Sequence, residues 1–179
     1  MKAVTYEQFL EFKPCWLDDG RAEKLAKIGA RKKEWTAVDI LKLRGVSIED
    51  KFWAVLREEF IEAPVLHEFT CRCAERALTN AKVTDERSWN AIRVKRLWLK
   101  GEATGEELAA AGDAAGDAAA WDAARGAAWD AARDAARDAA RDAAWDAAWD
   151  AAWAAAWAAE RAWQERELIK MLKEVGWSE

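Results

Sequence analysis

Hydrophobic side chains in the first hundred residues recur at spacings of three and four, which is the period of an α-helix. After Pro64, which suits the first turn of a helix, the apolar positions form two adjacent stripes. These stripes are Leu66, Phe69, Cys73 and Ala77, and His67, Cys71, Ala74 and Leu78. No segment shows a sustained period of two. The pattern therefore predicts an all-α fold with essentially no sheet.

Short polar motifs predict where the helices begin. A Ser or Thr followed three positions later by an acid or amide is typical of a capping box, in which each side chain satisfies the other residue's backbone N–H. The chain has four such motifs: Thr5 with Gln8, Thr36 with Asp39, Ser47 with Asp50, and Thr104 with Glu107. We expect residues 1–103 to form a domain that is a bundle of short helices.

Residues 85–100 carry apolar side chains on two nearly opposite sides of the predicted helix. One line holds Trp89, Ile92 and Leu99, and the other holds Ala91, Val94 and Trp98. Such a helix is expected to be packed on both sides. The charged side chains of the preceding helix point away from its apolar stripes, and two of them, Glu75 and Arg76, could pair across helices.

From Thr104 the chain changes to a four-residue unit, Ala-Ala-X-Asp, in which X is Gly, Arg or Trp. Residues 109–162 contain 30 Ala among 54 residues. Because Ala is the best helix former, we predict that residues 104–179 form one long helix, as a second domain.

The four-residue period does not match the 3.6 residues of a helical turn. Each unit advances by about 400°, so the X side chains drift by about 40° per unit and wind slowly around the helix. Neighbouring X residues are i,i+4 neighbours, which lets Arg141 lie over Trp145 as a cation–π pair.

A straight helix over residues 105–173 would be about 100 Å long, whereas a compact domain of this size has a radius of gyration near 16 Å. Either the segment folds back, near Gly126 or between Gly112 and Gly116, or it projects and another chain covers its Trp residues. We favour a long helix that self-associates, with a dimer as the favoured homo-oligomer and a kink as the alternative to a straight rod.

The spiral of Trp and Arg is the candidate protein-binding surface, because these residues are favoured at interfaces. The same Trp residues could instead form the core of the protein or of a dimer. The candidate partner-binding residues are Trp121, Trp129, Arg133, Arg137, Arg141, Trp145, Trp149, Trp153 and Trp157.

Overall composition excludes several classes of protein. With 28 Lys and Arg against 33 Asp and Glu, the net charge of −5 excludes a generic basic nucleic-acid binder. The Asp series could imitate nucleic-acid phosphates, but a solvated helix face is the preferred interpretation, and a nucleic-acid partner is not expected. Residues 151–159 are apolar but too few to span a membrane, so no membrane partner is expected either.

A single His and three Ser leave few residues for general-base or nucleophilic chemistry, so we predict no enzyme, no catalytic residues and no cofactor. The three Cys exclude a disulfide scaffold, and no signal peptide opens the chain, which favours a reducing, cytoplasmic location. His67, Cys71 and Cys73, with Cys15 elsewhere, are interpreted as core residues and not as metal ligands. Cys71 and Cys73 would lie about 200° apart on a helix.

Three segments carry a resemblance to a known family. They are His67–Leu78, Lys95–Glu102 and the end of the Ala-rich run from Ala159 to Gln164. Together they resemble a family of bacterial immunity proteins with alanine-rich helical C-terminal halves, which also occurs in phage and mobile elements. The resemblance implies a cytoplasmic protein that neutralises a protein partner, a toxin or a bacterial defence component, by binding it. It implies no catalytic residues.

Overall fold

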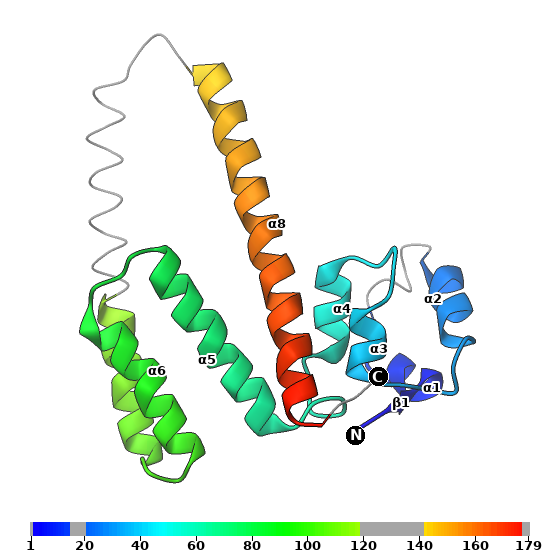
Figure 1. Ribbon diagram of the computed structural model, residues 1–179, viewed down its shortest axis with the longest axis horizontal. Coiled ribbons are helices and arrows are strands. Elements are labelled where there is room, and N and C mark those ends of the chain that lie inside the picture. Colours follow the sequence, from blue (N-terminus) through cyan, green and yellow to red (C-terminus); the bar gives the residue numbers. More distant parts are fainter. Residues whose placement is uncertain (1, 15–20, 119–141, 177–179) are drawn as a thin grey trace. The chain divides into compact units, whose positions relative to one another are not determined.

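The computed structural model describes residues 2–14, 21–118 and 142–176, and of residues 142–153 it describes only the backbone (Figure 1). The described chain is mostly helical, which confirms the predicted all-α fold. Its labelled elements are β1 (Val4–Thr5), α1 (Tyr6–Glu11), α2 (Ala22–Gly29), β2 (Glu34–Trp35), α3 (Ala37–Leu41), α4 (Ile48–Val55), α5 (Ala63–Asn80), α6 (Glu86–Leu99) and α8 (Asp142–Glu174). Residues 105–118 are also helical.

The described residues depart from the all-α prediction at one small sheet. Strands β1 and β2 are antiparallel, with Val4 opposite Trp35 and Thr5 opposite Glu34. Each strand has two residues, so neither is long enough to show an alternating pattern in the sequence. Both Val4 and Trp35 are buried, and the pair therefore closes one side of the core.

The predicted capping motifs begin helices as expected. Thr5 and Thr36 form complete capping boxes with Gln8 and Asp39 at the starts of α1 and α3. The Ser47 hydroxyl accepts a hydrogen bond from the backbone N–H of Asp50 at the start of α4. Thr104 and Glu107 exchange hydrogen bonds at 3.1 and 2.7 Å where the helix of residues 105–118 begins.

The chain divides into two compact units. The first unit consists of residues 1–66 and 162–179, and the second unit consists of residues 67–161. The composition-based division at residue 103 is a different one and stays a prediction. Of the two places where the segment could fold back, Gly112–Gly116 lies within the continuous helix of residues 105–118, and Gly126 lies outside the described residues.

The first unit has a well-formed apolar core. Side chains from the loop after α4 and from the last turns of α8 are buried almost completely, and α3 packs on α4. The largest fully buried side chains of the described chain all belong to this unit, namely Phe60, Leu41, Ile61, Leu168, Leu172 and Val55. The first unit therefore draws its core from segments separated by almost a hundred residues of chain.

The second unit buries fewer large side chains. Its buried apolar residues in the described part are Phe69, Cys71, Ile92, Ala111 and Ala118. The expectation that α6 is packed on both sides is met only in part, because Ala91 and Val94 are half-buried whereas Trp98, on the same line, remains 37% exposed. The ammonium of Lys95 lies 4.0 Å from the Trp98 ring centroid, and the edge of His67 contacts the same ring, so these side chains only partly cover it.

A close contact in the first unit depends on Gly29, the last residue of α2. A Cβ atom at this position would lie 2.6 Å from Cγ and 2.9 Å from Cε2 of Tyr6. Such distances are far below van der Waals contact, so the Tyr6 ring can rest on α2 only because residue 29 lacks a side chain.

Replacing Gly29 with Ala should lower the stability of the first unit by about 1–3 kcal/mol, because the Tyr6 ring must move. Thermal unfolding followed by circular dichroism measures the effect. Gly112→Ala is the matched control. It lies in a helix, and none of the described residues comes within 4 Å of an added Cβ, so the substitution should stabilise the protein by up to about 1 kcal/mol. Equal stability of Gly29→Ala and the wild type would contradict the role given to Gly29.

Candidate partner-binding surface

The most unusual surface of the described chain lies on α8 at residues 154–159, which we call the apolar run. All six side chains are exposed, and all are Ala except Trp157, which is 53% exposed. Six consecutive residues make more than one and a half helical turns, so they cover every side of the helix. A helix that is apolar on all sides is normally buried. The apolar run is therefore a surface suited to contact with another molecule.

The Trp157 indole is held along the helix by the residue one turn later. The guanidinium carbon of Arg161 lies 4.7 Å from the Trp157 ring centroid. A cation–π contact of this kind contributes about 0.5–1 kcal/mol at an exposed site. It restricts the indole before any partner arrives, which lowers the entropy lost on binding.

In the second unit, the residue that follows the apolar run is fixed by an ion pair. Glu160 accepts a hydrogen bond from Nε of Arg76 on α5 at 2.7 Å, and each side chain is about a third exposed or less. This pair confirms the expectation that Arg76 pairs across helices. It sets the rotation of α8 immediately next to the exposed segment.

In the first unit, the end of α8 is anchored more firmly. The ammonium of Lys51, a residue only 9% exposed, donates to Oε1 of Glu165 at 2.7 Å. Leu168, Met171 and Leu172 are buried one turn further along. Along α8 the side chains are thus exposed at residues 154–159 and half-buried at residues 160–165. From residue 166 on, buried core side chains alternate with more exposed ones.

Helices α5 and α6 of the second unit are joined by a charged cluster around Arg96. Its guanidinium donates to Glu68 at 2.9 and 3.0 Å, and to both carboxylate oxygens of Glu75, one of them at 2.9 Å. Arg72 donates to the same Glu68 carboxylate at 3.1 Å. The predicted pairing of Glu75 across helices is confirmed. The charged face of α5 therefore contacts neighbouring helices.

This cluster changes the acidity of Glu68. Hydrogen bonds from Arg96 are the largest influence and lower the pKa of the Glu68 carboxyl below its ordinary value, burial opposes them, and Arg72 lowers the pKa further. In the same cluster, the hydrogen bonds to Glu75 and then to Glu68 raise the pKa of Arg96. Glu68 and Arg96 are thus charged at neutral pH, and the geometry of the cluster serves to position the helices.

The candidate site residues are only partly described. Trp157 is exposed, and the backbone at Trp145, Trp149 and Trp153 is helical within α8. Trp121, Trp129, Arg133, Arg137 and Arg141 lie outside the described residues. Arg161 was not among the predicted site residues, although its i,i+4 spacing from Trp157 is the same signal that pairs Arg141 with Trp145.

The described residues that were considered as possible metal ligands lie in different environments. The Cys71 thiol is free and buried, and burial is the main cause of its raised pKa. Cys73 is half-buried, and the His67 and Trp98 rings form a T-shaped pair with a centroid distance of 6.0 Å. Within the described ranges, no three His, Cys, Asp or Glu side chains form a group that could hold a metal ion.

No protein-family model, curated protein or solved structure matches the chain. Among the described helices, none combines the length and the apolar composition needed to cross a membrane.

Replacing Arg96 with Met should keep the apolar stem of the side chain but remove the link between α5 and α6. We expect a loss of about 1–2 kcal/mol in the free energy of unfolding, because the partly exposed carboxylates retain some water. Urea unfolding measures the loss. Arg93→Met, an exposed position on the same helix that donates to Asn90, is the matched control and should change stability by less than about 0.5 kcal/mol. Equal losses of stability in the two variants would show that the contacts of Arg96 with the two carboxylates do not stabilise the protein.

Acid should lower the free energy of unfolding of the wild-type protein, because Glu68 becomes protonated. Because folding lowers the pKa of this carboxyl from 4.5, its contribution is complete above that pH and is lost as the pH falls through the lowered value. The free energy of unfolding should therefore fall between about pH 5 and pH 3, and it should fall less steeply in Arg96→Met than in Arg93→Met. Parallel pH profiles of the two variants would contradict this assignment.

Proposed function

We propose that the protein acts by binding another protein through α8, with the apolar run as the central contact. The observation that carries the proposal is the exposure of six consecutive apolar residues, including Trp157, around the whole circumference of the helix. Water contact with such a segment is unfavourable, and a groove in a partner would remove it.

The Trp157 side chain alone can supply the energy of one anchor residue of an interface. About half of the Trp157 side chain is exposed, and covering it would contribute about 2–3 kcal/mol at 25 cal/mol per Å². That is the magnitude expected of an interface hot spot. The surrounding Ala side chains are small, so a partner's backbone or side chains can approach the helix axis closely.

The structure of α8 favours recognition as a preformed helix. The ion pair of Glu160 with Arg76 and the pair of Glu165 with Lys51 hold the helix C-terminal to the apolar run. A partner therefore binds a helix that is already ordered. Less conformational entropy is lost on binding than when a free peptide folds on its partner.

We further propose that this binding neutralises the partner, which would be a toxin or a bacterial defence component, and that the protein is not an enzyme. The neutralising role rests on the resemblance of residues 67–78, 95–102 and 159–164 to immunity proteins. The non-enzymatic role rests on the scarcity of His and Ser, and on the packing of the single His against Trp98.

Replacing Trp157 with Ala in the full chain should weaken partner binding by about 30-fold or more, which corresponds to about 2 kcal/mol. The partner is first identified by affinity capture from the source cells and mass spectrometry, and its affinity is then measured by calorimetry with purified proteins. Trp98→Ala, which removes a partly exposed Trp from α6, is the matched control and should bind with wild-type affinity.

Unchanged affinity of Trp157→Ala for the captured partner would contradict the proposed surface. Light scattering provides a separate outcome. If the wild-type chain is a dimer at micromolar concentration and Trp157→Ala is a monomer, a second copy covers the apolar run, and the neutralising role is replaced by self-assembly.

A further inference from the structure

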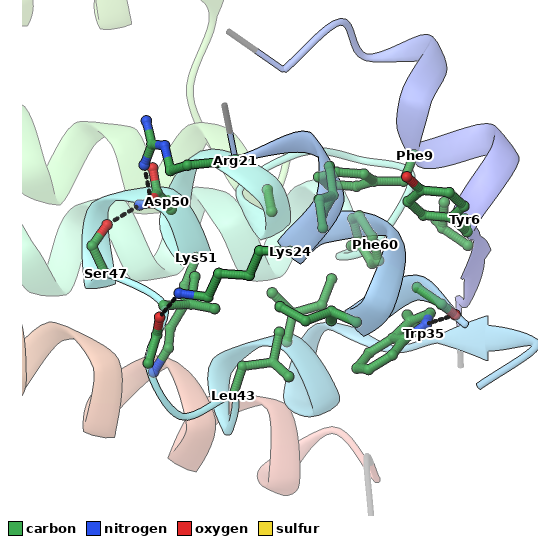
Figure 2. A pocket seen from close by; sticks show the side chains of 18 of the residues that line it. Tyr6, Phe9, Arg21, Lys24, Trp35, Leu43, Ser47, Asp50, Lys51 and Phe60 are labelled. Atoms are coloured by element: carbon green, nitrogen blue, oxygen red, sulfur yellow. Dashed lines mark hydrogen bonds and ion pairs between the residues drawn. The ribbon is translucent and has the colours of Figure 1, made fainter. Parts of the chain in front are cut away.

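The first unit contains a pocket of about 250 Å³ that has no part in the proposed contact at α8. It is lined by residues of β1, α1, α2, β2, α3 and α4 and of the loops next to them, and Figure 2 shows these side chains around it. An apolar cavity of about 150 Å³ is large enough to hold benzene, so this pocket can hold a single ring or a short alkyl chain.

The walls of the pocket differ from end to end. Figure 2 shows Tyr6, Phe9, Trp35 and Phe60 grouped at one end, and Arg21, Ser47 and Asp50 at the other. The Trp35 indole donates weakly to the carbonyl oxygen of Gly29 at 3.4 Å, and the Lys32 ammonium lies over the ring at 5.9 Å from its centroid, which leaves one ring face for apolar contact. A ligand that fits this arrangement is apolar at one end and polar at the other.

The charges that line the pocket are mostly positive. Arg21, Lys24 and Lys51 contribute three cations, and Asp50 contributes one acid. The Asp50 carboxylate is paired with Arg21 at 3.0 Å, and the Lys51 ammonium is paired with Glu165 at 2.7 Å. These pairs leave Lys24 as the cation that determines which charge the pocket accepts.

Lys24 has no carboxylate partner among the described residues. Its ammonium donates to the carbonyl oxygen of Gly45, in the turn before α4 where the backbone φ of +72° favours glycine. This contact uses one of three N–H donors and holds the ammonium beside the pocket. No hydrogen bond within the described ranges uses the remaining donors, so they can serve an anionic group of a ligand, and a cationic group would be repelled.

We propose that this pocket binds a small monocarboxylic acid with an apolar body. The carboxylate accepts hydrogen bonds from Lys24, and the apolar body lies among Phe9, Trp35 and Phe60. Fully neutral ligands lack the charge that Lys24 selects, and the volume is too small for a nucleotide or for an extended peptide.

Calorimetric titration of the full-length protein tests the charge preference with three probes of one chain length, namely octanoate, octanamide and octylammonium. Octanoate should bind with a dissociation constant on the order of 0.1 mM, about fivefold more tightly than octanamide, and octylammonium should bind most weakly. Absence of saturable octanoate binding up to about 5 mM would overturn the proposal, and equal affinities for the three probes would do so too.

Lys24→Gln should remove the preference for octanoate over octanamide while leaving octanamide binding unchanged. Lys27→Gln, on the same helix, is the matched control. The Lys27 ammonium pairs with Glu23 at 2.6 Å, and the residue does not line the pocket, so its loss should leave the preference intact. Loss of the preference in both variants would assign it to the general charge of α2 and overturn the role of Lys24.

Filling the pocket tests its location. Leu43→Trp should weaken octanoate binding at least tenfold, whereas Leu56→Trp, at an exposed position that does not line the pocket, should not. If Leu43→Trp does not fold, as judged by circular dichroism, the location of bound octanoate is determined by NMR in the wild-type protein instead. Nuclear Overhauser effects between octanoate and the Trp35 and Phe60 rings would support the site. If octanoate binds but shows these effects only with residues outside the pocket, the proposal is overturned.

Discussion

Burial of three side chains at the end of α8 is the interaction on which the rest of the first unit depends. Leu168, Met171 and Leu172 are nearly inaccessible to water, and each such side chain contributes about 1.5–3 kcal/mol when it is buried. Residues 1–66 alone lack these side chains. Because the same three residues belong to α8, the core that stabilises the first unit also fixes the C-terminal end of the helix that carries the apolar run.

The two units are stabilised in different ways, and this difference matches the roles proposed for them. The first unit has a large apolar core with a pocket beside it, whereas the described part of the second unit buries few large side chains and relies on Arg96 and Arg76 to hold its helices. Partly exposed ion pairs give less free energy than an apolar core but more geometric specificity. In the second unit they set the registers of α5, α6 and the adjacent part of α8.

The features that the sequence predicts correctly are those set by neighbours along the chain. The capping residues Thr5, Thr36, Ser47 and Thr104 act over three positions, and the helical composition needs no tertiary information. The bidentate role of Arg96 could not be predicted, because it requires α5 and α6 to be placed side by side. The pocket likewise joins residues from Val4 to Phe60, and its two-residue strands are too short to show a period.

The late position of the last core residues has a consequence for synthesis of the protein. When Leu66 has been added to the growing chain, the 95 residues of the second unit must still be translated before synthesis reaches the part of α8 that holds Leu168 and Leu172. At about 5–20 residues per second, this delay is about 5–20 s. During that time the nascent chain exposes the apolar surfaces that α8 later covers, so the early segment is a natural substrate for chaperones that bind unfolded polypeptides at the tunnel exit.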